Sequence, residues 1–218
     1  GGDVLLADAL SVKKLTLSSD PKIIAASKNI VITIGTPVDE FLDPEFKGIQ
    51  NAFLKILPYI YNEQLLILRS TVYPGTTEWL AGFLKSKDRS PLISFCPERV
   101  VQGKAIAEIL DLPQIVSGTT PGAEEAATKF FNFIGVEIVR LSPLEAEFAK
   151  LFSNAYRYIL FAIANQFFMI CNSSGVDFER VMKGVKHKYP RLEGLTSAGF
   201  AAGPCLFKDT MLLNSYAK

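Results

Sequence analysis

Short runs of apolar residues alternate with amphipathic stretches in the first part of the chain. The apolar runs at residues 29–37, 64–73, 91–100 and 136–142 predict strands, because each is rich in Ile, Val, Leu or Phe. Helical spacing predicts helices at residues 46–60, 75–85, 104–110 and 121–134. Continuous apolar strands that alternate with helices indicate an α/β unit, with a parallel sheet covered on both faces.

The pattern changes after residue 142. Residues 144–174 contain no Gly or Pro and keep helical spacing, which predicts one helix of about 30 residues, or about 45 Å, stopped by Gly175. Asp177 is a suitable cap for a second helix. We therefore expect two domains, an α/β domain at residues 1–142 and an α-helical domain at residues 143–218.

Composition and charge narrow the class of protein. Hydrophobic residues make up 49% and charged residues 21% of the chain, as in a globular protein, and the net charge of +1 does not favour nucleic acid or a membrane as partner.

Cys96 and Cys171 lie in apolar runs and are expected in the core, and the one histidine, His187, is expected on a surface loop. With so few Cys and His we expect no metal site and a reducing cytoplasm. No signal-peptide pattern opens the chain, and the longest apolar stretch, residues 158–171, is too short to span a bilayer.

The turns after the predicted strands form a candidate ligand edge, because ligands bind at the carboxyl ends of parallel strands. Thr36 follows the first strand, Thr71 the second, and Glu98 and Arg99 the third. A threonine in such a turn is able to hydrogen-bond a cofactor or a bound water. Ordinary turn chemistry is the alternative, since Ser, Thr and Gly are expected in turns.

Lys150, Asn154 and Arg157 share one face of the predicted long helix, within about 60°. An ammonium and an amide one turn apart can point at one oxygen and stabilise the charge that builds there. The alternative is a solvated polar stripe on an amphipathic helix.

Cys205 differs from the other two cysteines because it follows Gly203-Pro204 and directly precedes a helix that is predicted to begin near Leu206. The unpaired N–H groups of that helix would favour a thiolate, and Lys208 would add positive charge. Asp209, one turn after Cys205, could orient a water or the thiol. A structural cysteine beside a surface Lys-Asp pair is the alternative.

Five segments, taken in order, resemble the UDP-glucose/GDP-mannose dehydrogenase family: IGTPVDE, RSTVYPGTTE, CPERVVQGKAI, AKLFSNAYRY and AAGPCLFKD. They extend over residues 34–209 in the family's order and spacing. The resemblance implies a partial Rossmann-like parallel sheet that binds NAD, followed by an α-helical central domain with one long helix, as in 6-phosphogluconate dehydrogenase-like folds. The PERV-x-x-GKA form looks most like the branch that oxidises UDP-N-acetylmannosamine or UDP-N-acetylglucosamine.

The resemblance also implies an activity and roles for single residues. The family oxidises the C6 alcohol of a nucleotide sugar to a carboxylate with two NAD. By this resemblance Cys205 is the nucleophile, which forms a thiohemiacetal with the aldehyde and then a thioester that water hydrolyses. Lys150 and Asn154 match the oxyanion-stabilising pair, and Thr71 and Asp209 match residues that hold a catalytic water. The residues that match cofactor contacts are Thr36, Thr71, Glu98 and Lys208. Those that match substrate contacts are Glu98, Arg99, Val100, Lys150, Asn154, Arg157, Arg191 and Gly203. The resemblance implies that Arg191 is supplied by a partner subunit.

One position departs from the family pattern. The UDP-glucose branch has a second glutamate four residues after the first, and this chain has Gln102 there. A neutral amide cannot act as a general base. The departure weakens UDP-glucose as the substrate and leaves the hydrolytic base open.

Family members also carry an N-terminal Gly-rich segment and a C-terminal nucleotide-sugar-binding domain, and neither is found in this sequence. We therefore expect a fragment that is inactive alone and binds NAD weakly, because the pyrophosphate would lack its helix N-terminus. We also expect a homodimer through the long helix, because an apolar stripe on that helix needs a cover. The stripe consists of Leu160, Ile163, Phe167 and Ile170.

Alternatives remain open both within and outside the family. UDP-glucose and UDP-N-acetylglucosamine are alternative substrates. A β-hydroxyacid or 6-phosphogluconate-type dehydrogenase shares the Lys-x-x-x-Asn helix but oxidises without a thiol, so Cys205 discriminates against it. A non-catalytic dimerisation module is the third hypothesis, and NAD binding would separate it from an enzyme.

Overall fold

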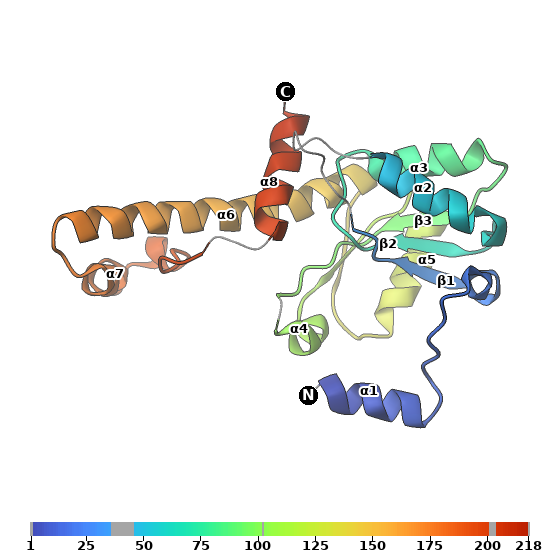
Figure 1. Ribbon diagram of the computed structural model, residues 1–218, viewed down its shortest axis with the longest axis horizontal. Helices are drawn as coiled ribbons and strands as arrows, with labels where there is room; N and C mark the ends of the chain where they lie inside the picture. Colours follow the sequence, from blue (N-terminus) through green and yellow to red (C-terminus); the bar gives the residue numbers. More distant parts are fainter. Residues whose placement is uncertain (1, 36–45, 102, 201–203, 218) are drawn as a thin grey trace. The chain divides into compact units, whose positions relative to one another are not determined.

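The computed structural model describes residues 2–35, 46–101, 103–200 and 204–217 (Figure 1). The chain forms two compact units, the first holding the described residues up to Phe148 and the second those from Ala149 onward. The domain division expected at residue 143 stays a prediction.

Parallel strands form the centre of the first unit. Strands β1 (Asn29–Ile32), β2 (Leu65–Leu68) and β3 (Leu92–Phe95) pair in the order β1-β2-β3, with Val31 opposite Ile67 and Ile67 opposite Ser94. Strands β4 (Gln114–Val116) and β5 (Ile138–Arg140) form a second parallel pair. The predicted parallel α/β architecture is confirmed.

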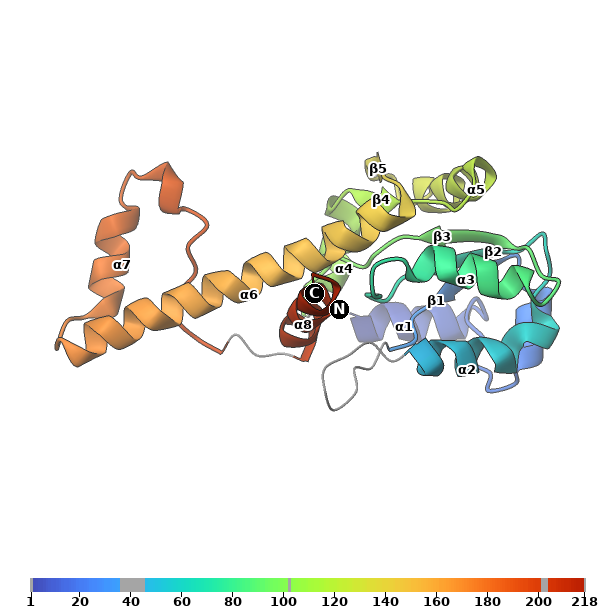
Figure 2. The ribbon, with the colours of Figure 1, turned by 90° about the horizontal axis from the view of Figure 1, so that it is seen from above.

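Helices cover both faces of the three-stranded sheet, as the continuous apolar strands predict. Leu65 and Ile67 pack against α5 (Pro121–Asn132). Leu68 instead lines a small hollow. The same hollow is lined by side chains of α2 (Phe46–Ile56) and by the first residue of α3 (Thr76–Lys85). Figures 1 and 2 show α2 and α3 on one side of the sheet and α5 on the other. All four residues of β2 are buried because apolar side chains are needed on both faces of a sandwiched sheet.

Two remaining helices of this unit are short. Helix α4 (Ala105–Asp111) confirms the predicted helix after the third strand. Sequence patterns assigned no element to α1 (Gly2–Ser11), and none of its residues is buried. Among the described residues, no helix is both long and apolar enough to cross a membrane.

The helix predicted at residues 46–60 is too long. Helix α2 ends at Ile56, and a 3₁₀ turn at Leu57–Tyr59 follows. Pro58 lacks an N–H and disfavours helical geometry in the residue before it, so the α-helix stops there. Ile60 is nevertheless fully buried, which explains why the apolar spacing continued beyond the helix.

The predicted long helix is α6 (Pro143–Ser173), which has 31 residues and begins in the first unit. Gly175 follows it at φ 66°, a left-handed conformation that glycine adopts without strain. Asp177 caps α7 (Phe178–Lys186) by accepting hydrogen bonds from the N–H groups of Glu179 and Arg180. Both the stop and the cap are as the sequence predicts.

Candidate functional site

The candidate residues fall into two sets, one in each unit. In the first unit, a buried arginine that the sequence analysis missed organises the carboxyl ends of the strands. Arg69 follows β2 directly, and its Nε and Nη2 donate to Oε2 of Glu98 at 3.1 and 2.7 Å. Its Nη1 donates to the carbonyl of Cys96 at 3.0 Å, and Nη2 also donates to Oε1 of Gln114 at 3.0 Å. The signal in the sequence was a cation directly after four apolar strand residues.

Both carboxylate oxygens of Glu98 accept hydrogen bonds. Its second oxygen, Oε1, accepts the backbone N–H groups of Arg99 at 2.8 Å and Val100 at 3.1 Å. Burial raises the pKa of Glu98, but the Arg69 guanidinium and the two N–H donors outweigh it and hold this pKa below its usual value. An ionised group with both oxygens occupied is a poor proton acceptor, so Glu98 is suited to holding the turn at residues 98–100.

This geometry predicts how Glu98→Gln changes stability with pH. Because the folded-state pKa lies below the usual 4.5, the stabilisation from this carboxylate is present above pH 4.5 and is lost as the pH falls through the folded-state value. We expect the variant to be less stable than the wild type at pH 7 and the difference to shrink toward pH 3. Urea unfolding midpoints across this range measure the difference, with the exposed Glu63→Gln as control. A pH-independent difference would contradict the proposed ion pair.

The other candidates of the first unit lie at the same edge. Thr71 is half-buried and follows β2 by three residues. Arg99 is exposed, and Val100 is half-buried. Thr36, predicted as a cofactor contact, lies outside the described residues, as does Gln102.

In the second unit, α6 and α8 (Pro204–Tyr216) bring two predicted residues into direct contact. The Nδ2 of Asn154 donates to Oδ2 of Asp209 at 2.6 Å. Asn154 is 6% and Asp209 1% exposed, so the pair is shielded from solvent. Oδ1 of Asp209 has no hydrogen-bond partner among the described residues, and Nζ of Lys208 lies 3.8 Å from it. A buried carboxylate oxygen without a donor is a ready acceptor for a water or a substrate hydroxyl.

Cys205 lies in the first turn of α8, one turn before Asp209, and is exposed. The helix begins at Pro204, slightly earlier than predicted, since proline suits the first helical position. Cys96 is fully buried, as predicted, and burial raises the pKa of its thiol to about 12. Cys171 is half-buried against α7. Of the three thiols, Cys205 is therefore the most exposed.

The remaining candidates of the second unit are on its surface or partly covered. Lys150 is half-buried on α6, and Arg157 is exposed. Arg191 is exposed, and its guanidinium lies over the ring of Tyr189 at 5.3 Å from the centroid. Gly203 lies outside the described residues.

A second missed residue ties α6 to the segment that leads to Cys205. Nδ2 of Asn165 donates to the carbonyl of Gly199 at 2.8 Å, and Oδ1 of Asn165 accepts the N–H of Gly199 at 2.8 Å. One side chain thus satisfies both backbone groups of Gly199. In the sequence, Asn165 is only a polar interruption of an apolar run, because its partner is 34 residues away.

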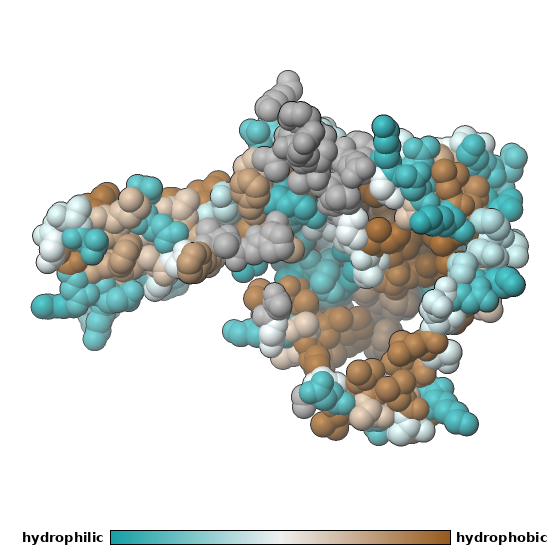
Figure 3. Space-filling model, viewed as in Figure 1, coloured by the Kyte–Doolittle hydropathy of each residue, from teal (hydrophilic) through white to brown (hydrophobic). Residues whose placement is uncertain are grey.

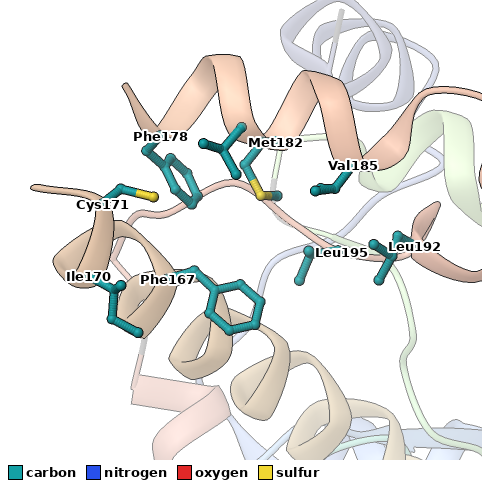
Figure 4. A pocket seen from close by; sticks show the side chains of 9 residues that line it. Phe167, Ile170, Cys171, Phe178, Met182, Val185, Leu192 and Leu195 are labelled. Atoms are coloured by element: carbon teal, nitrogen blue, oxygen red, sulfur yellow. The ribbon is translucent and has the colours of Figure 1, made fainter. Parts of the chain in front are cut away.

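An apolar hollow of about 380 Å³ lies between α6 and α7. Phe167, Ile170 and Cys171 of α6 line one side, and Phe178, Met182 and Val185 of α7 line the other, as Figure 4 shows. The lining offers no polar surface, so it has no groups to bind a nucleotide sugar. This hollow is not a candidate for the active site.

Comparisons with known proteins identify the class to which this fold and these residues belong. Residues 1–133 match the NAD binding domain, and residues 144–218 the central domain, of the UDP-glucose/GDP-mannose dehydrogenase family. The chain belongs to this family, so the resemblance inferred from the five segments is confirmed.

Individual relatives carry more particular names. The chain is 29% identical to NDP-N-acetyl-D-galactosaminuronic acid dehydrogenase of Ralstonia solanacearum, over 95% of this chain and 51% of the relative. It is 30% identical to UDP-N-acetyl-D-mannosamine dehydrogenase of Methanocaldococcus jannaschii, over 86% of this chain and 44% of the relative. The structure of the UDP-D-ManNAc dehydrogenase from Pyrococcus horikoshii superposes with a TM-score of 0.88 at 28% identity, covering 98% of this chain and 52% of the other. The chain spans about half the length of the curated relatives it matches.

Proposed function

We propose that the whole protein oxidises the C6 hydroxyl of a UDP-sugar to the uronic acid. The proposed UDP-sugar is UDP-N-acetylmannosamine. UDP-glucose and UDP-N-acetylglucosamine are the alternative substrates. The observation that carries the proposal is the geometry at the start of α8, where the exposed Cys205 precedes a buried Asp209 that is hydrogen-bonded to Asn154. Family membership and the names of the relatives support the substrate class.

The carboxyl edge of the first sheet is proposed to bind NAD. Ser70, Ile34 and Val72 border a hollow of only about 20 Å³ after β1 and β2, which is too small for a nucleotide ring. The support for NAD is therefore the match to an NAD binding domain and the position of this edge at the carboxyl ends of parallel strands. The residues proposed to hold the cofactor are Thr36, Thr71, Glu98 and Lys208. When bound, NAD accepts a hydride in each of the two oxidations.

Cys205 explains how one site carries out both oxidations. The first oxidation converts the C6 alcohol into an aldehyde, which has no alcohol carbon left to oxidise. The sulfur of Cys205 adds to the aldehyde carbon, and the carbonyl oxygen takes a proton, which restores a tetrahedral carbinol as a thiohemiacetal. The second oxidation yields a thioester. A water then attacks its carbonyl carbon, the C–S bond breaks, and Cys205 leaves as the thiolate.

Groups on α6 and α8 serve the charges that develop in these steps. Lys150 and Asn154 are proposed to stabilise the oxyanion on the C6 oxygen, and Lys150 to exchange a proton with it. Thr71 and Oδ1 of Asp209, which accepts no hydrogen bond from the residues that the structure describes, are proposed to hold the attacking water. Arg99, Val100, Arg157, Arg191 and Gly203 are proposed substrate contacts.

The test is a substrate screen with the full-length enzyme. UDP-N-acetylmannosamine, UDP-N-acetylglucosamine, UDP-glucose and GDP-mannose are each supplied in limiting amount, and the NADH formed per sugar is counted. Two NADH per molecule of one UDP-sugar support the thioester route. One NADH per sugar would instead favour a two-electron dehydrogenase.

We also propose a homodimer through α6. Ile163, Phe167 and Ile170 are 38, 45 and 60% exposed and recur at helical spacing, and Figure 3 shows apolar side chains on the surface of α6. We expect light scattering of the full-length protein to give a dimeric mass and Ile170→Asp to weaken the dimer. Leu110→Asp is the matched control, because Leu110 is also 60% exposed but lies on α4. A monomeric wild type would contradict the dimer.

A further inference from the structure

Glu147 is a buried acid that none of the steps above uses. It lies near the start of α6 and is 1% exposed. Oε2 accepts the backbone N–H of Gly75 at 2.6 Å, and Oε1 accepts the N–H of Thr77 at 2.9 Å and its Oγ1 hydroxyl at 2.5 Å. These partners precede Glu147 by 70 and 72 residues, so the contact joins distant parts of the first unit.

The carboxylate supplies what the start of α3 lacks. The residue at the cap position is Gly75, at φ 91°, which has no side chain to accept the unpaired N–H groups of the first turn. Glu147 accepts two of these N–H groups and places negative charge at the positive end of the helix. Because these N–H groups are already used, they are not available to bind a phosphate.

Glu147 thereby joins two elements that carry proposed catalytic groups. The turn that ends at Gly75 also contains Thr71, and α6 carries Lys150 three residues and Asn154 seven residues after Glu147. We propose that Glu147 is a positioning residue, which clamps the Thr71 turn to the start of the helix that presents Lys150 and Asn154. This inference rests on the proposed function, since it assigns Glu147 a role in the same reaction.

Glutamine cannot replace this clamp although it has the same shape. Each oxygen of Glu147 faces at least one N–H, so an amide –NH₂ placed on either side would oppose a donor. Burial raises the pKa of Glu147, the N–H and hydroxyl donors oppose this effect in part, and the nearby Glu78 adds to it. Ionised Glu147 is thus held at some electrostatic cost, which its N–H and hydroxyl donors offset in part.

The experiment uses the full-length enzyme and compares Glu147→Gln, Thr77→Val, the double variant and Glu78→Gln. Thr77→Val removes the hydroxyl but keeps the backbone N–H. Glu78→Gln removes the same charge from an exposed side chain in the first turn of α3 and is the control. For each variant kcat, KM for the UDP-sugar and the melting temperature are measured.

We expect Glu147→Gln to lower kcat about tenfold to a hundredfold with KM within about twofold, because misplacing a catalytic group affects the reaction more than binding. Thr77→Val should lower kcat less, and the double variant should lose less than the product of the two single effects. Glu78→Gln should keep kcat within about twofold of the wild type, because it leaves the hydrogen bonds of Glu147 to Gly75 and Thr77 in place.

Two results would overturn the inference while leaving the proposed function intact. One is a folded Glu147→Gln enzyme with kcat within twofold of the wild type. The other is multiplicative effects of Glu147→Gln and Thr77→Val on kcat. If the wild type itself does not form two NADH per sugar, the proposed function fails first, and this result is separate from either of the two.

Discussion

In the full-length protein, Cys205→Ala is expected to lower kcat for oxidation to the uronic acid by roughly a thousandfold or more, because the nucleophile is removed. Without the sulfur no thiohemiacetal forms, so the aldehyde cannot become a thioester. We expect NADH formed per UDP-sugar to fall from two to one or fewer. NADH absorbance with limiting sugar and identification of the product by mass spectrometry measure both effects.

The other two cysteines provide the control for this experiment. Cys171→Ala removes a half-buried thiol that packs against α7, and we expect it to keep two NADH per sugar. If Cys205→Ala also kept two NADH per sugar, the thioester route would be wrong, and a dehydrogenase that needs no thiol would be favoured. The accessible position of Cys205 in the first turn of α8 is the structural reason for choosing this residue.

The second large effect is on stability. Asn154→Asp would place a second carboxylate at the position where Nδ2 now donates to Oδ2 of Asp209 over 2.6 Å. Two buried carboxylates at this distance cannot both be ionised, and a buried charge without compensation costs about 3–5 kcal/mol. Lys208, with Nζ 3.8 Å from the other oxygen of Asp209, offsets only part of this cost.

The destabilisation caused by Asn154→Asp should increase as the pH rises. A proton shared between the two carboxyl groups would restore one hydrogen bond, so the folded variant binds a proton more readily than the unfolded chain. Its stability relative to the wild type is therefore highest in acid and falls as the pH rises. Urea unfolding at pH 5 and pH 8 measures the difference.

Asn172→Asp is the matched control for this prediction, because Asn172 is an exposed asparagine on the same helix. We expect it to change the free energy of unfolding by less than about 0.5 kcal/mol at either pH. An Asn154→Asp variant that is as stable as this control at pH 8 would show that Asn154 and Asp209 are not paired.

Local patterns in the sequence predicted the parts of this protein that depend on neighbouring residues. The apolar runs predicted strands β1, β2, β3 and β5 but not β4 (Gln114–Val116), and the absence of Gly and Pro predicted α6. Asp177 predicted a helix cap, and Gly203-Pro204 predicted the start of α8. Five short segments predicted the family, since the order of such segments is a property of the chain alone.

Contacts between distant residues could not be predicted in this way. Glu147 was a polar position in a helix pattern until its partners, 70 and 72 residues earlier, showed it to be a cap for α3. Arg69 was a strand-end cation, and its partners Glu98 and Gln114 lie 29 and 45 residues away.

The sequence alone therefore determined the fold class, the family and the identity of the candidate thiol. It did so because periodicity, capping and motif spacing act over a few residues along the chain. Tertiary structure alone decided that Asp209 is buried against Asn154 and that Glu98 is held by Arg69 as an ionised group. Burial and hydrogen bonding depend on which segments meet in space, and two side chains far apart in sequence carry no local sign that they will form a hydrogen bond with each other.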